Sequence, residues 1–468
     1  LQLLASLDGN PAQALKWAQE RLAVDSSDLE SQFNKTIALC QLGRLEDSFV
    51  SMKQAIAAGL PAERFQAGPR HLLRPLIGYE GVAEYLSERT NGLVHGPMLG
   101  CVNDRSARVW LRTATETEVV VKVFACDERS RPTPEVVGTA RAVTNPQHDY
   151  TALVELDFLT PDTEYVYDVT IAGQSVLPAE LPRLKTLPKQ SAPGQLKIAF
   201  GGGAGFNPEN EHIWSTIEDR APDALFLLGD NVYIDLAEEP RGLHQYTYYR
   251  RQSRPEFRRL VASTPVYAIW DDHDCAIDDV WMGPYLDRPS WKPSMLTVFK
   301  ENWVNPAYGN SQQPGCWFEV SLAGIDFFFL DTRYFRTNPF GKQRTMLGPV
   351  QKEWLMSRLS ESQTPLKVIV SSVPWAPNGF PEEREEIFQL IEARRIEGVL
   401  LVSADRHRSD AWKIERPNGY ALYDVMSSRL TNQHFHECFP DALFCYNEGC
   451  SFGMLSFDTS VTDPTVLY

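Results

Sequence analysis

Three apolar runs in this chain stop abruptly at polar residues that bind metals, and this feature limits the fold more than any other. The runs are 224–228, followed by Gly229-Asp230-Asn231-Val232-Tyr233; 266–270, followed by Asp271-Asp272-His273-Asp274; and 399–403, followed by Ala404-Asp405-Arg406-His407. Apolar runs without alternation are typical of strands buried on both faces, and in open α/β sheets ligands collect where such strands end. We therefore predict a sheet with the functional site at its carboxyl edge, at Asp230 above all.

The residue types at these strand ends indicate bound metal. A carboxylate beside a His at a buried strand end is costly to desolvate unless a cation or a proton shares the charge. The Asp230 carboxylate would bridge two ions, because one carboxylate can give an oxygen to each of them. Asp405 and His407 are two residues apart, so on an extended strand end they would point to the same side. The sequence predicts a site for two metal ions.

At these segments the chain resembles the PhoD-like alkaline phosphatases of the calcineurin-like metallophosphoesterase superfamily. The resemblance rests on Gly229-Asp230-x-x-Tyr233, Trp270-Asp271-Asp272-His273-Asp274, Leu330-Asp331-Thr332-Arg333-x-Phe335-Arg336 and Ser403-Ala404-Asp405-Arg406-His407. These motifs stand in the family's order, and the match extends from about residue 93 to near the C-terminus. The resemblance implies a catalytic domain over 195–468, built as an α/β/α sandwich with two mixed sheets.

The resemblance also implies a role for individual residues. The implied metal ligands are Asp230, Tyr233, Asp272, Asp405 and His407. Within this set, Asp405 is expected on the harder ion and His407 on the other. Residues expected to brace the site or contact substrate are Asn231, Asp274, Asp279 and Arg406.

Two residues are expected to act on the substrate. His273 would give a proton to the leaving oxygen, and Arg333 would clamp two phosphoryl oxygens. A structural pairing of Arg333 with Asp331 is the alternative interpretation. His434 and His436 lie where the family's closing loop nears the site, and we interpret them as substrate contacts rather than ligands.

The expected cofactor is a pair of metal ions, Ca²⁺ with Fe³⁺, with Mn²⁺ or another divalent ion as the alternative. Carboxylates, one phenolate and one imidazole suit these ions better than zinc. Tyr233 would bind as phenolate only beside a strongly Lewis-acidic ion, because free Tyr has a pKa near 10. Relatives carry a Cys ligand where this chain has Gly203, so a water, Asn207 or a different metal would have to fill that position.

The function that follows is metal-dependent hydrolysis of a phosphate ester, with a metal-bound hydroxide attacking phosphorus. Monoester and diester substrates both stay open. We expect the inserts at 283–310 and 432–450 to form the walls of the substrate pocket. We interpret the aromatic residues at the first insert mainly as core residues; they are Trp281, Tyr285, Trp291 and Trp303. Two alternatives remain. One is a catalytically degenerate scaffold or binding protein that uses its N-terminal helices, and the other is a different metal-dependent hydrolase, such as a sulfatase, on the same fold.

The whole chain is predicted to be a multidomain α+β protein. Residues 1 to about 60 carry a 34-residue repeat, with Gly9 matched by Gly43 and Leu3 by Ile37. This repeat predicts that 1–92 is a tetratricopeptide-like helical segment with a connector, which binds a partner or packs on the catalytic domain. Residues 93–188 alternate with period two and resemble a fibronectin type III-like β-sandwich with a tyrosine corner at Tyr165. Residues 189–194 are predicted to be a linker.

Composition limits the kinds of partner and the cellular location expected for the protein. The 468 residues carry a formal net charge of −16, which argues against nucleic acid as the main partner. No apolar run approaches the roughly 18 residues of a membrane span. The eight cysteines form no CxxC pair; Cys438, Cys445 and Cys450 are close enough for one local disulfide, but we interpret them as buried thiols. The family resemblance favours a periplasmic or secreted protein.

Overall fold

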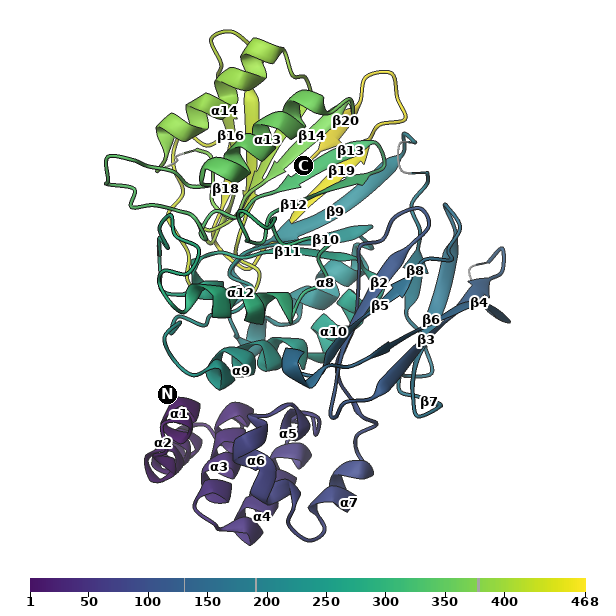
Figure 1. Cartoon of the computed structure of the whole chain (residues 1–468), viewed down its shortest axis with the longest axis vertical. Helices are drawn as coiled ribbons and strands as arrows, with labels where there is room; N and C mark the ends of the chain where they lie inside the picture. Colours follow the sequence, from purple (N-terminus) through teal and green to yellow (C-terminus); the bar gives the residue numbers. More distant parts are fainter. Residues whose placement is uncertain (130, 190–191, 377–378) are drawn as a thin grey trace.

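The computed structural model describes residues 1–468 apart from 130, 190–191 and 377–378, and three regions follow one another along the chain (Figure 1). The first is helical, the second is a β-sandwich, and the third holds two mixed sheets flanked by helices. Among the described residues, no helix is long and apolar enough to cross a membrane. The predicted linker at 189–194 lies partly outside the described residues.

The N-terminal region is a layer of short helices: α1 (Gln2–Leu7), α2 (Pro11–Val24), α3 (Leu29–Gln41), α4 (Leu45–Ala57), α5 (Arg64–Ala67), α6 (Arg70–Ile77) and α7 (Val82–Ser87). Gly9 and Gly43 follow α1 and α3 with φ of 73° and 74°, so the two predicted repeat positions share one left-handed turn conformation. Leu3 and Ile37 are buried in one core. Helical hairpins are present, and their assignment to the tetratricopeptide class stays a prediction.

The second region packs two antiparallel sheets face to face. One sheet has the order β1 (Leu93–Gly100), β2 (Ala107–Thr113), β5 (Thr151–Leu156); the other has the order β4 (Pro132–Val143), β3 (Glu118–Cys126), β6 (Glu164–Ile171), β7 (Gln174–Ser175), with β8 (Arg183–Lys185) also beside β6. The Tyr165 hydroxyl accepts a hydrogen bond from the Thr160 backbone at 3.0 Å, as expected of a tyrosine corner. The finer fibronectin type III-like assignment stays a prediction.

The third region contains the two mixed sheets. The five-stranded sheet has the order β11 (Val266–Ile269), β10 (Ala224–Leu228), β9 (Gln195–Gly201), β19 (Gly453–Asp458), β20 (Thr465–Leu467). The seven-stranded sheet has the order β12 (Phe318–Leu322), β13 (Ile325–Phe329), β14 (Leu366–Val370), β15 (Val399–Ser403), β17 (Leu422–Ser427), β16 (Ser409–Ile414), β18 (Phe444–Tyr446). Strands β9, β10 and β11 are parallel, as are β13, β14, β15 and β17. The carboxyl ends within each parallel set therefore meet at one edge.

Helices cover both sheets. In Figure 1, α13 (Pro349–Glu361) and α14 (Pro381–Arg394) lie over the seven-stranded sheet, while α8 (Ile213–Asp219), α9 (Arg241–Gln252), α10 (Pro255–Ser263) and α12 (Lys292–Lys300) lie on the side of the five-stranded sheet. The one-turn helix α11 (Asp272–Cys275) follows β11 directly.

Burial on both faces explains the unbroken apolar runs. On β13, Phe327 and Phe329 face the core between the sheets, while Phe328 faces the core under α13 and α14. Phe226 of β10 contacts Phe329 and Phe327 with ring centroids 4.8 and 5.2 Å apart, which joins the two sheets. Each fully buried Phe contributes about 1.5–3 kcal/mol to folding.

Two details of the sequence interpretation need correction. Cys438 and Cys445 form a disulfide with Cα atoms 5.9 Å apart, so these two are not free thiols, whereas Cys450 is free. A seven-residue spacing permits either state, and only the course of the loop decides. The aromatic residues at the first insert do not all belong to the core as predicted. Trp303 is 1% exposed and is a core residue, whereas Trp281 is 50% exposed.

A buried arginine joins the sandwich to the third region. The Arg112 guanidinium on β2 is fully buried and pairs with Asp149 at 3.0 Å. It also donates to Gln252 at 2.7 Å and to Asn302 at 2.9 Å, which belong to the third region. A buried guanidinium with all these partners fixes the relative position of the two regions.

Replacing this guanidinium should therefore destabilise the protein. We expect Arg112→Leu to lower the free energy of unfolding by about 3–5 kcal/mol, because Asp149 would be left buried without its partner. Thermal and urea denaturation measure the change. Arg141→Leu, on an exposed pair with Glu118, is the control and should shift the midpoint little. Equal stabilities of the two variants would contradict this account.

Candidate metal centre

The end of β10 positions the first carboxylate. Gly229 has φ of 102°, and a Cβ there would lie 2.5 Å from the Asp271 Cβ, so only glycine lets the ends of β10 and β11 approach. Asp230 follows with φ of 50° and is 2% exposed. Other non-glycine residues in the left-handed region at this edge are Asp235, Asp279, Asp405 and His407. Strained backbone of this kind gathers at functional sites.

One group of ligands forms around Asp230. Its Oδ2 accepts a hydrogen bond from the Tyr233 hydroxyl at 3.0 Å and lies 3.1 Å from His407 Nε2. The Tyr233 hydroxyl is 3.2 Å from the same His407 nitrogen. The Asn432 amide donates to the Tyr233 hydroxyl at 2.5 Å. Carboxylate, phenol and imidazole thus converge on one point.

A second group forms around Asp272. One carboxylate oxygen from each of Asp271, Asp272 and Asp405 lies within 4.8 Å of the others. Asp272 also shares a cluster with Asp230 and His273, so the two groups adjoin. The backbone amides of His273 and Asp279 donate to the Asp272 carboxylate at 3.0 and 2.6 Å and fix its orientation.

Arg333 is inserted into the second group. Its side chain is fully buried, its Nε donates to Asp271, and its Nη2 lies 3.2 Å from Asp272 and 3.6 Å from Asp405. Its backbone amide donates to Asp331 at 2.9 Å. The complete burial disfavours the predicted phosphoryl clamp and favours a structural pairing, although the guanidinium pairs with Asp271 and Asp272 rather than with Asp331.

His273 lies at the rim of the site with one nitrogen fixed. Its Nδ1 is 2.5 Å from the Asp235 carboxylate, and its ring centroid is 4.5 Å from that of Tyr233. Burial lowers the pKa of His273, but the hydrogen bond to Asp235 and the charge of Asp230 outweigh burial and raise it to about 10. The Nε2 edge is the part of the ring left to act on a substrate.

The residues predicted to brace the site differ in position. Asp274 accepts from the backbone amides of Asn231 at 3.1 Å and Asp271 at 2.9 Å, and Asn231 donates its amide to Ile269, so these side chains tie β10 to β11. Arg406 reaches Asp405 at 3.1 Å from the surface. The exposed Asp279 carboxylate lies 3.6 Å from Arg333.

The charges at this edge fit bound cations. Burial, and then the neighbouring charge of Asp272, holds the pKa of Asp230 well above its usual range, and burial with Asp271 does the same for Asp405. In the described part of the chain, buried atoms without a hydrogen-bond partner include Asp230 Oδ1, Asp271 Oδ2 and His407 Nδ1. Carboxylates that repel one another and have unsatisfied oxygens are suited to hold hard cations.

The structure brings together all five predicted ligands, but it groups two of them differently. His407 contacts Tyr233, whereas Asp405 is grouped with Asp271 and Asp272. We expected Asp405 and His407 to point to the same side of an extended strand end, but their φ angles of 76° and 45° lie outside the extended region. The alternation rule for strands does not hold there.

Sequence reasoning missed Asp235 and Asn432. Asp235 lies two residues after Tyr233 in the loop that follows β10, and Asn432 comes from a loop nearly 200 residues away in the sequence. Asn207, the expected substitute for the absent Cys, instead donates to the Thr431 carbonyl at 2.8 Å. The amide that reaches Tyr233 is that of Asn432.

Comparison with known proteins shows the family of this chain. A model of the PhoD-like phosphatase family matches residues 198–439, which is more than half of the chain. The chain belongs to the PhoD-like phosphatase family. A model described as a domain of unknown function, DUF7800, matches residues 90–189 of this PhoD-like protein.

Individual relatives are distant. Alkaline phosphatase D of Bacillus subtilis (strain 168) is 22% identical over 375 residues, which cover 66% of this chain and 61% of that relative. The chain thus spans about three fifths of the length of this curated relative. A solved structure of PhoD aligns with a TM-score of 0.67 at 15% identity, covering 81% of this chain and 89% of that one. The purple acid phosphatase PPD1 from yellow lupin (Lupinus luteus) aligns with a TM-score of 0.58 at 12% identity, covering 78% and 70%.

This PhoD-like chain has no room for a side chain at Gly203. The residue has φ of 67°, and a Cβ would lie 2.1 Å from the Ser428 carbonyl oxygen and 3.2 Å from His407 Cδ2. The Ser428 carbonyl and the His407 ring occupy the space that a side chain at position 203 would need. Glycine at this position is therefore required by the local fold.

We expect Gly203→Ala to destabilise the protein because the new methyl group would displace Ser428 or His407. Gly173→Ala is the matched control: its φ of 79° carries the same conformational cost, but nothing lies within 4 Å of the added Cβ. The Gly203 variant should lose about 1–3 kcal/mol more than the control in chemical denaturation. Equal losses would show that the close approach to Ser428 is not required.

Proposed function

We propose that this protein hydrolyses phosphate esters at a pair of cations held by the strand-end carboxylates. The observation that carries the proposal is the meeting of two ligand groups at one sheet edge, one around Asp230 and one around Asp272. Asp230, Tyr233 and His407 would hold one ion, and Asp272 with Asp405 would hold the other. Asp230 lies close enough to Asp272 to bridge the two ions.

The cofactor chemistry is that of a two-metal phosphoesterase. Two bound cations supply Lewis-acid polarisation of the phosphoryl group and neutralise the charge that develops as the ester bond breaks. The carboxylate-rich ligands favour Ca²⁺ or Mn²⁺ at the Asp272 side. At the Asp230 side, Tyr233 favours Fe³⁺ or another strongly Lewis-acidic ion. Arg333 would hold Asp271 and Asp272 in place from behind.

His273 would supply the proton for the leaving oxygen. Asp235 holds Nδ1, so a protonated ring presents its Nε2–H outward, toward the exposed side chain of Asp278 at 3.9 Å. After the transfer the ring is neutral and keeps its Nδ1–H on Asp235. The ring edge is partly exposed, with 19% of the side chain accessible, so a substrate oxygen can reach it.

The absent cysteine favours a second candidate, a catalytically degenerate scaffold. Gly203 removes one expected ligand, and the helical region offers a surface of its own. Para-nitrophenyl phosphate and its bis-ester, assayed with Ca²⁺, Mn²⁺ and Fe³⁺, test the two functions against each other. Turnover of either ester supports the enzyme, and the preferred ester identifies a monoesterase or a diesterase. No turnover with any ion would favour the scaffold.

Removing the proposed proton donor should abolish most of this activity. We expect His273→Ala to lower kcat by about 10²–10⁴-fold, the usual contribution of a positioned general acid. Asp230→Asn should lower activity at least as far and also reduce metal content, because it removes the bridging carboxylate. His212→Ala, on an exposed helix start, serves as the control. Normal turnover in either site variant would overturn the assignment.

Asp235 should act as a positioning residue for His273. We expect Asp235→Asn to lower kcat by about 10-fold with KM nearly unchanged, because the amide no longer holds Nδ1–H and stabilises the protonated ring less. The matched control is Asp278→Asn, whose carboxylate is 87% exposed and 3.9 Å from Nε2. Steady-state kinetics separate the two variants. A purely structural effect of Asp235 would instead appear as lower stability in both substrate-bound and free protein.

A further inference from the structure

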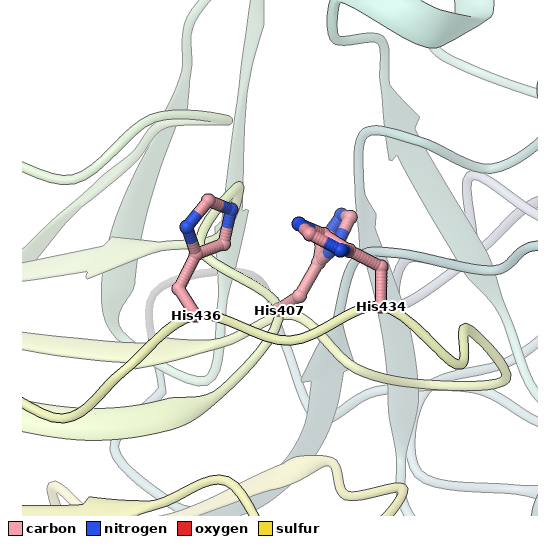
Figure 2. A group of neighbouring side chains, drawn as sticks. All are labelled: His407, His434 and His436. Atoms are coloured by element: carbon pink, nitrogen blue, oxygen red, sulfur yellow. The ribbon is translucent and has the colours of Figure 1, made fainter.

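Three histidines gather beside the carboxylate groups (Figure 2). His407 comes from the segment after β15, whereas His434 and His436 come from the loop between β17 and β18. One nitrogen from each ring lies within 4.8 Å of the other two. The ring centroids are 5.2 Å apart for His407 and His434, 5.8 Å for His407 and His436, and 4.9 Å for His434 and His436.

The rings do not stack on one another. The planes of His407 and His434 cross at 85°, those of His434 and His436 at 85°, and those of His407 and His436 at 60°. Stacked rings would hide their nitrogens between parallel faces, whereas crossed rings can turn their edges toward a shared point. This arrangement is the one that coordination by ring nitrogens requires.

The loop that carries two of these rings is anchored at several points. Arg429 donates to the carbonyls of Asn432, Gln433 and Asn447 at 3.2, 3.0 and 2.5 Å. The His434 amide donates to Asn432 at 3.1 Å, and the Asn447 amide donates to the His436 carbonyl at 3.1 Å. The Cys438–Cys445 disulfide closes the segment that follows. The imidazoles are thus presented by a braced loop rather than by free side chains.

One ring nitrogen of His407 is available to bind a further ligand. Its side chain is 6% exposed; Nε2 lies beside Asp230 and Tyr233, while Nδ1 has no hydrogen-bond partner among the described residues. A buried ring nitrogen without a partner is uncommon unless it serves a function. The ring therefore lies between the carboxylate group on one side and a second set of ligands.

Zinc binds through the lone pair of an imidazole nitrogen. The meeting of one nitrogen from each of three rings favours His434 and His436 as metal ligands over their interpretation as substrate contacts.

We propose that His407, His434 and His436 bind a divalent transition-metal ion such as Zn²⁺ next to the carboxylate-held cations. His407 would offer this ion Nδ1, which has no hydrogen-bond partner among the described residues. When Nε2 also holds the ion beside Asp230, the ring would release its N–H proton to solvent and bind both ions as an imidazolate, because a neutral imidazole has only one free lone pair. Three imidazole nitrogens with an open fourth position are a ligand set that zinc accepts and that calcium does not. The ion would tie the loop at 432–436 to His407 and so to the edge of the carboxylate site. The inference does not rest on phosphoester hydrolysis.

The test is metal binding by the full chain. The purified protein is stripped with chelator, kept in excess Ca²⁺, and titrated with Zn²⁺ by calorimetry and elemental analysis. Co²⁺ replaces Zn²⁺ in a parallel series, because its visible absorption reports nitrogen ligands and coordination geometry. The test variant carries His434→Gln together with His436→Gln. The control variant also replaces two histidines, His71→Gln and His148→Gln, which are both exposed on the surface. Circular dichroism checks that each variant is folded.

We expect the His434/His436 variant to lose about one equivalent of tightly bound Zn²⁺ and the matching Co²⁺ absorption, while the control keeps both. The Asp272→Asn variant should keep the Zn²⁺ equivalent bound by the histidines and lose ions from the carboxylate groups. The experiment therefore distinguishes failure of the proposed hydrolytic site from failure of the proposed histidine site. Unchanged Zn²⁺ binding in the His434/His436 variant would overturn the proposal. Loss of every ion in that variant would overturn it too, because the loop would then serve the carboxylate centre.

Discussion

The mutual repulsion of buried aspartates at one sheet edge is the constraint on which the site depends. Asp230, Asp271 and Asp272 are at most 2% exposed, and Asp405 lies against them. Arg333 supplies one fixed positive charge behind them, and His273 supplies a second at the rim. The pKa of Asp230 and of Asp405 stays raised in spite of these charges. Cations at the unsatisfied oxygens would relieve the repulsion, so the carboxylates and the metals account for each other.

The rest of the fold holds these charges in place. Parallel strands in both sheets end at the same edge, and the Phe226, Phe327 and Phe329 contacts lock one sheet to the other. Gly229 permits the close approach of two strand ends that a single methyl group would prevent. The sandwich and the helical layer bind the back of this region through the buried Arg112 and through Tyr246, which packs in the helical core. The free energy gained from packing away from the site thus offsets the conformational cost of the left-handed backbone at Asp230, Asp405 and His407.

Much of this arrangement could be predicted from the sequence because its signals are local. An unbroken apolar run followed by Gly-Asp or Asp-Asp-His marks a buried strand and its functional end without any knowledge of the partner strands. The side on which Asp405 and His407 lie could not be predicted, because both residues leave the extended conformation. Asp235 and Asn432 lie in loops, which leave no periodic pattern in the sequence. The Cys438–Cys445 bond likewise depends on the path of a loop.

The most direct test of the central claim is elemental analysis of the purified chain before and after chelation, with turnover of para-nitrophenyl phosphate measured on the same samples. The account predicts at least about two metal equivalents for each chain in the carboxylate groups. It also predicts loss of turnover on chelation and recovery when Ca²⁺ or Mn²⁺ and iron are returned. A folded protein that holds no metal and shows no turnover after these ions are added would contradict the account.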